Sequence, residues 1–551
     1  MHQSDTSTRL LCQRFIIATL VIILPFWWVL FTNPYLNAAD LSFYTIGTDL
    51  FAEALFSGDV YPRWLFAAND GEGSPVFVFY PPLSAYITSL FYWMDGFDPL
   101  GQYRYLASMT LAILMSGICF FLWLRHHTSP TVAAIASILF ILGYYRQYML
   151  YFQNGLAMQW ALAIIPFIFY LCDRLHARGA YAAPLLTLGM AALLLTHIPG
   201  FILTVPIAGT YLLLFSHAGR RGHYFLVFSA ALFIAASISS FYWLPAMLSR
   251  PFIGLGGFTT RLMPADWSHV REYIPLLLAL LSALAMWKYR PGSSPKAPFK
   301  RLLYFFGGAA LLAFPLFLPG MGWLWTNFTP LHYLQFPERL FPFLQILFAL
   351  LIASWLPECP RITRIGIYIL TLSFMVVLLA QPYWRNTSSA SLLQGIYALR
   401  FIHPEEYIPK WVKDSGEDMY ILKRVKKLES AHAAQSITVI TGAAQVTTAD
   451  ERNYTMQVSS GHATFTLRHH YFPHLRLVSD TKEWVVLFPA ETGVIRFSLP
   501  KGTHMLTLQE GPLPFQHISN LLSSMALAVF FLWLLSSRQR AKKASGTVSA
   551  R

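Results

Sequence analysis

Runs of apolar residues about 18–22 residues long recur along the chain, and they constrain its fold more than any other feature. A helix of that length crosses the hydrocarbon core of a bilayer, so each run predicts a transmembrane helix. The composition agrees, because only 12% of the residues are charged, about half the share of a soluble protein. We therefore expect an α-helical polytopic membrane protein with about 12 transmembrane helices. The expected spans are 15–33, 103–124, 131–145, 157–174, 180–196, 199–215, 224–243, 271–289, 302–318, 339–356, 364–381 and 516–536.

The net charge of +14 comes mostly from lysines and arginines in short segments between these runs. All of these segments fall on one side of the membrane if 15–33 runs outward and 81–94 does not cross. The positive-inside rule assigns that side to the cytoplasm, with both chain termini. This distribution explains the charge better than nucleic-acid binding does, so no nucleic acid is expected as a partner. The segments are Arg125–His127, Arg174–Arg178, Arg220–His223, Lys288–Arg301, Arg361–Arg364 and Arg538–Lys543.

The stretch 81–94 (PPLSAYITSLFYWM) is apolar but short, and it opens with two prolines. If it crossed the membrane, the basic segments would no longer share one side. We therefore expect an interfacial or re-entrant helix here. The first external loop then covers residues 34–102.

Residues 382–515 have a different pattern, with short alternating stretches such as ITVITG and ATFTLRHH. Turn residues separate these stretches, as at Gly461 and Pro500–Gly502. This pattern is typical of an antiparallel β-sandwich. We expect three parts: a transmembrane domain (1–381), an external β-sandwich domain (382–515), and an anchor helix with a basic cytoplasmic tail (516–551).

The first external loop carries a motif that starts at Asp40. It reads D-x18-D-x-YPRW, followed by N-D-G-x-G-SP-x-F-x-FYPPL. This motif resembles a family of multi-pass bacterial membrane proteins known as 6-pyruvoyl-tetrahydropterin-synthase-related, which is similar to membrane glycosyltransferases of the GT-C fold. Weaker matches follow in the family's order. They are LLLTHIPG (193–200), SSFYWLPAM (239–247), LQFPERL (334–340) and YFPHLRLVSD (471–480).

The resemblance implies a glycosyltransferase of the bacterial inner membrane. Such an enzyme moves a sugar from a polyprenyl-phosphate donor to an envelope glycan or lipid acceptor on the outer face. No cofactor and no metal are expected. Pterin chemistry is unsupported, because no histidine cluster with metal-site spacing lies outside the membrane.

The chain departs from the family pattern at several positions. Tyr44 stands where the family has histidine, and Glu338 where it has tryptophan. The charged ends of the family's Arg-Gly-Ala-x-x-Glu segment are replaced by Asn154 and Gln159. These changes leave a non-catalytic envelope-assembly scaffold open as an alternative. A transporter is the other alternative, although neither mid-span charges nor inverted repeats are evident.

The transfer needs a base for the acceptor hydroxyl and a cation for the departing phosphate. Asp40 is the first candidate base, because it follows the first span and would lie at the membrane surface. An aspartate there also caps a following helix well, and the two roles are compatible. Asp49 is the second candidate, against the alternative of a solvated helix face.

Arg339 is the candidate phosphate ligand, with Gln335 and Glu338 beside it. The alternative is an interfacial arginine that pairs with Glu338 or extends to the surface. His197 lies where two spans meet outside, as a substrate ligand or as a hydrogen-bonded structural residue. Arg63 binds lipid headgroups or, the simpler interpretation, braces the loop.

Two further groups of residues have both a binding and a structural interpretation. Asp70 and Glu72 flank a glycine and could hold a divalent cation, but a solvated loop is the simpler interpretation. The aromatic and basic residues around Arg468–Arg476 could bind glycan, or protect an edge strand. We favour the structural interpretation for both, with the β-domain as a docking accessory. The expected partners are the lipid-linked sugar, the acceptor and membrane lipids.

Overall fold

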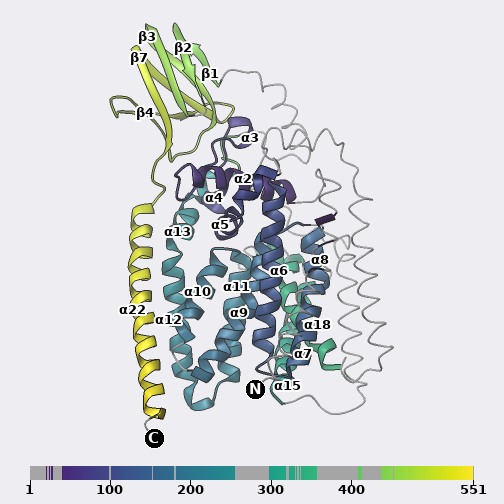
Figure 1. Cartoon of the computed structure of the whole chain (residues 1–551). Coiled ribbons are helices and arrows are strands. Elements are labelled where there is room, and N and C mark those ends of the chain that lie inside the picture. The colour runs from purple at the N-terminus through teal and green to yellow at the C-terminus, as the bar shows by residue number, and fades with distance from the viewer. Residues whose placement is uncertain are drawn as a thin grey trace.

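The computed structural model shows a helical part with a β-sheet at one end (Figure 1). We call the two ends of the helical part the sheet end and the far end. The structure describes ten segments and six single residues. These are 40–97, 101–151, 153–178, 182–254, 297–317, 322–328, 337–355, 407–412, 436–450 and 452–549, with residues 20, 24, 27, 28, 331 and 334.

Five helices in the described residues are long and apolar enough to cross a membrane. Two shorter apolar helices, α7 (Pro130–Leu142) and α10 (Ala183–Leu194), lie among them. The spans expected at 271–289 and 364–381, and most of 15–33, lie outside the described residues. The five long helices are α6 (Gln102–Leu124), α9 (Leu156–Arg178), α11 (Ile198–Phe215), α12 (Arg221–Ile238) and α22 (Gln516–Ser549).

The span expected at 131–145 is interrupted. The helix α7 ends at Leu142, Gly143 is extended, and α8 (Tyr144–Tyr151) begins directly after it. The other expected spans within the described residues correspond to helices with boundaries shifted by a few residues, except that α22 continues well past the expected end at 536 to Ser549. Among them are α15 (Ala297–Ala313), which continues into the 3₁₀ turn η5 (Phe314–Phe317), and α18 (Phe341–Trp355).

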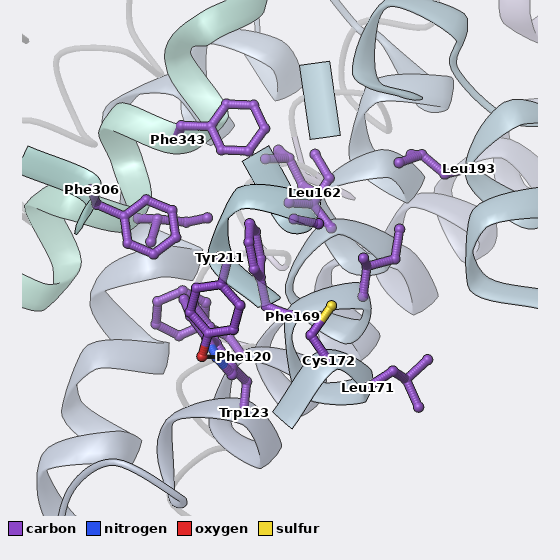
Figure 2. Close-up of a cluster of buried hydrophobic side chains, with 14 of the residues drawn as sticks. Phe120, Trp123, Leu162, Phe169, Leu171, Cys172, Leu193, Tyr211, Phe306 and Phe343 are labelled. Atoms are coloured by element: carbon purple, nitrogen blue, oxygen red, sulfur yellow. Dashed lines mark hydrogen bonds between the residues drawn. The ribbon is translucent and has the colours of Figure 1, made fainter. Parts of the chain in front are cut away.

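The interior of the helical part is filled by aromatic and aliphatic side chains (Figure 2). The rings of Trp123 and Phe169 stack with centroids 5.2 Å apart, and Tyr211 meets Phe169 at the same distance. Near the far end this core gives way to polar groups. Asp173 accepts hydrogen bonds from Tyr211 at 2.7 Å and lies 2.6 Å from His127 Nε2. This far-end network ties α6, α9 and α11 together beside the basic segments.

The first loop folds into short helices at the sheet end (Figure 1). The stretch 81–94 contains only seven residues of α-helix, so it is too short to cross a membrane as a helix, as predicted. The long α2 lies beside it and packs on α5 and α6. The elements are α2 (Leu41–Phe56), α3 (Ala68–Gly71), α4 (Val76–Phe79), α5 (Leu83–Ser89) and η1 (Tyr92–Phe97). The remaining short elements are η3 (Ala218–Arg220), α13 (Ser240–Ser249), η4 (Arg250–Phe252), α16 (Gly322–Asn327) and η6 (Pro337–Leu340).

The sheet is antiparallel, as predicted, but its described strands form one continuous seven-stranded sheet and not two packed sheets. Its order is β1-β3-β7-β4-β5, with β2 also on β3 and β6 also on β7. The two longest strands pair along most of their length, for example Phe465 with Phe497. The strands are β1 (Ile437–Thr441), β2 (Ala444–Ala449), β3 (Asn453–His470), β4 (Leu475–Ser479), β5 (Trp484–Val485), β6 (Phe488–Pro489) and β7 (Val494–Glu510).

The residues expected to separate strands lie inside β3 and β7. The pairing register shifts between Val458 and His462, which is a bulge in β3. Before the bulge the buried side chains are at even positions (454, 456, 458), and after it at odd positions (463, 465, 467). Because the bulge inserts extra residues into β3, the long β3–β7 pair keeps a single buried face along its length.

The first loop and the sheet share one hydrophobic core. Trp64, Val78 and Phe79 from the loop belong to the same buried cluster as the sheet residues Phe465 and Phe497. Trp64 packs on Phe472 with ring centroids 5.7 Å apart. The predicted division of the chain into three parts stays a prediction, although this shared core already links the first loop to the sheet.

Candidate functional site

Asp40 lies immediately before α2, but it does not cap that helix with its side chain. Its backbone N–H donates to the carbonyl of Gln153 at 3.0 Å, which ties the start of α2 to the start of α9. The carboxyl group is partly buried. The Asp40 side chain therefore does not serve as the N-terminal cap of α2. Its carboxyl interacts with other groups.

Those groups are charged and come from a segment 300 residues later. Arg339 and Glu338 on η6 both act on the Asp40 carboxyl. Burial raises the pKa of Asp40 to about 6; the positive charge of Arg339 opposes this rise and the negative charge of Glu338 adds to it. At neutral pH the carboxylate is therefore mostly ionised, with a basicity well above that of an exposed aspartate.

His197 connects this pair to the helices. Its Nδ1 accepts the N–H of Gly200 at 2.8 Å and so caps α11, while its Nε2 lies 3.1 Å from Nη1 of Arg339. Burial, with the nearby Arg339 charge, lowers the pKa of His197 well below its usual value. With Nδ1 accepting from Gly200, a neutral imidazole carries its proton on Nε2, so His197 lies beside the guanidinium without accepting from it and without cancelling its charge. Both sequence-based interpretations of His197 are thus compatible with its place.

Two tyrosines complete the arrangement. Tyr44, one helical turn after Asp40, shares a hydrogen bond between hydroxyl groups with Tyr80. Burial raises the pKa of Tyr44 well above its usual value, and Tyr80 and Asp40 raise it further. Both rings also contact Phe43 edge-on, so they are held firmly. We call the six residues the Asp40 cluster. They are Asp40, Tyr44, Tyr80, His197, Glu338 and Arg339.

The other acid proposed as a base lies elsewhere. Asp49 is nine residues further along α2, about 14 Å along the helix axis. It pairs with Arg104 at 3.0 Å, and that arginine is fully buried. The structure thus brings Asp40 to Arg339 and keeps Asp49 in a separate ion pair between α2 and α6.

Arg63 is held against its own loop. Its guanidinium lies 3.9 Å from the centre of the Tyr61 ring and donates to the carbonyl of Phe241 at 3.4 Å. These contacts match the bracing role that the sequence favours. Gln335 lies outside the described residues.

The Asp70–Glu72 loop is not solvated, because both acids contact the sheet. Asp70 pairs with Arg468, and Glu72 lies 3.3 Å from His470 Nε2. The backbone adds a bond, since the N–H of His470 donates to the carbonyl of Glu72 at 2.7 Å. Within the described ranges, no group of three or more His, Cys, Asp or Glu residues is placed to hold a metal ion.

Sequence reasoning missed two neighbouring residues of α8. The Tyr145 hydroxyl is buried without a hydrogen-bond partner among the described residues, and the charges of Arg339 and Glu338 act on it. Arg146 is buried beside Gln159. Both were hidden at the end of an expected span, where Gly143 was the only signal that the helix breaks.

Comparisons with known proteins add no functional information for this site. No protein-family model matches the sequence, and no curated protein matches it. The resemblance to the 6-pyruvoyl-tetrahydropterin-synthase-related family therefore rests on the quoted motifs.

Proposed function

We propose that the protein is a membrane glycosyltransferase. It moves a sugar from a polyprenyl-phosphate donor to an envelope glycan or lipid acceptor. The observation that carries this proposal is the placement of the basic carboxylate of Asp40 beside the cation of Arg339 at the sheet end. A base and a phosphate ligand are the two groups that such a transfer requires.

In the proposed reaction, Asp40 accepts the proton of the acceptor hydroxyl as that oxygen bonds to the anomeric carbon of the sugar. The bond between the anomeric carbon and the phosphate oxygen breaks, and its electron pair stays with the phosphate. Arg339 stabilises the negative charge that remains there. His197 packs beside the guanidinium, and the Tyr44–Tyr80 pair borders the carboxyl that receives the proton.

The proposal includes a membrane arrangement. We place the helical part in a bacterial inner membrane with about 12 spans and a GT-C fold. The far end, beside the basic segments, faces the cytoplasm, and the sheet faces the outside. The Asp40 cluster then lies at the outer surface of the bilayer, where a lipid-linked sugar presents its phosphate. The exposed apolar side chains on α12 and α22 suit contact with lipid.

The test is incubation of the purified protein with a panel of labelled polyprenyl-phosphate sugars, followed by binding and transfer measurements. We expect one member of the panel to bind and its sugar to move to an added membrane-lipid or glycan extract. The Arg63→Lys variant is a matched control, since it changes a charged residue of the same loop that braces the structure. Absence of binding by every member would favour the scaffold.

A further inference from the structure

The break between α7 and α8 is built around a glutamine from α18. Gln345 Oε1 accepts the N–H of Arg146 at 3.1 Å, and its Nε2 donates to the carbonyl of Phe140. A Cβ atom at Gly143 would lie only 2.5 Å from the Gln345 side chain. Glycine therefore lets one amide satisfy both helix ends. Because Gln345 bonds both helix ends, the break between α7 and α8 is a defined structural feature and not local fraying.

Arg146, in the first turn of α8, is completely buried. Its Nη1 donates to Gln159 Oε1 at 2.6 Å and its Nη2 to Ser116 Oγ, which are both neutral acceptors. No carboxylate of the described chain pairs with it, and its Nε has no hydrogen-bond partner there. A buried cation without a counter-charge is strongly unfavourable, and such residues inside a membrane protein mark functional sites.

Arg104 provides the contrast. It is also completely buried, but Asp49 compensates its charge at 3.0 Å. Among the described residues, the chain thus neutralises one buried arginine and gives the other no carboxylate partner.

We propose that the Arg146 guanidinium forms a binding site for a phosphate-class oxyanion inside the helical part. A guanidinium matches phosphate geometry, and phosphate is the oxyanion that membrane lipids present most often. The source is either a lipid phosphate or free inorganic phosphate. The inference does not rest on the proposed function, because Arg146 is not one of the Asp40 cluster residues and its printed side-chain partners lie outside that cluster.

The test is equilibrium binding of two probes, inorganic phosphate and polyprenyl phosphate, to the purified full-length protein in detergent. We expect Arg146→Gln to raise the dissociation constant of the bound probe by about tenfold or more. Arg104→Gln is the matched control and should leave this constant unchanged. Binding of only one probe supports the site and identifies its source. Absence of binding by both probes to the wild-type protein overturns it.

Two further variants test whether the probe binds at Arg146 or in the Asp40 cluster, and whether the result depends on the folding of Arg146→Gln. Arg339→Gln should retain the binding of inorganic phosphate, although it weakens the binding of the lipid-linked donor. Loss of phosphate binding in this variant, with full phosphate binding in Arg146→Gln, would place the phosphate in the Asp40 cluster and overturn the inference. If Arg146→Gln does not fold, Arg146→Met replaces it, because it also removes the charge at similar length, and a wild-type dissociation constant in that variant contradicts the site. Without ligand, Arg146→Gln should melt no lower than wild type, whereas Arg104→Gln should melt lower.

Discussion

The Asp40 cluster and the far-end network are both groups of polar side chains held by helices, but their side chains differ in how fully hydrogen bonds and charge partners stabilise them. At the far end, Asp173 accepts a hydrogen bond from Tyr211 and contacts His127, and Trp123 donates to Tyr211 at 3.3 Å. In the Asp40 cluster, the carboxyl makes no helix cap, and burial raises its pKa to about 6. A closed network stabilises the fold, whereas an energetically strained acid beside a cation suits chemistry.

The largest expected effect separates the two acids of α2. Asp40→Asn should lower the transfer rate by about 10²–10⁴-fold, because the amide cannot accept the proton. Asp49→Asn should leave the chemical step intact and lower stability, because it leaves Arg104 buried without its partner. Single-turnover transfer by both purified variants checks this; equal rates in the Asp40 variant and wild type would remove Asp40 from the mechanism.

Arg339→Gln should weaken binding of the lipid-linked donor by about 10–100-fold, since it removes a charge-assisted contact to phosphate. His197→Gln is a milder change at the same place, because a neutral amide replaces a neutral imidazole. It should retain most of the affinity. Equilibrium binding with the labelled donor distinguishes the two, and an unaffected Arg339 variant would exclude the guanidinium as the phosphate ligand.

A substitution in the far-end network should change the stability of the protein but not its affinity for the donor. Asp173→Asn weakens two hydrogen bonds in a buried network, so the free energy of unfolding should fall by about 1–3 kcal/mol. The affinity for the donor should not change. Thermal unfolding alongside donor binding measures both quantities. If Asp173→Asn lost affinity for the donor but melted like wild type, the far-end network would have a functional role, which contradicts the comparison.

The last expected effect has the opposite sign, because Asp40→Asn should gain stability at neutral pH. The pKa of Asp40 is raised from 3.8 to about 6 on folding. The folded state thus holds more protons in that window, so stability falls as pH rises through it and stays lower above it. The variant avoids this loss, which is at most about 3 kcal/mol at pH 7. Near pH 4 the two proteins should melt alike.

The sequence was sufficient for the helical class, the antiparallel sheet and the short helix at 81–94. Each of these depends on local periodicity or length. The sequence also marked Asp40, His197 and Arg339, through motifs that the fold brings together. It did not predict that Asp49 would pair with Arg104, or that Asp70 would reach Arg468.

The features that the sequence could not supply are contacts between distant segments. The single sheet depends on a bulge in β3, where the alternation of buried residues changes its phase between Val458 and Ala463, so that one strand resembles two strands separated by a turn. The buried Arg146 was hidden for a similar reason. Its neutral partners Ser116 and Gln159 lie on other helices and carry no charge to suggest a pair.

The most direct test of the Asp40 assignment is the pH dependence of the single-turnover transfer rate in the wild-type protein. The active form of a base is the ionised carboxylate, so the rate should rise about tenfold per pH unit at low pH and level off above a pKa of about 6. The neutral His197 should add no second rise in this range. A rate that stays constant through this range, or falls as pH rises, would contradict the assignment of Asp40 as the base.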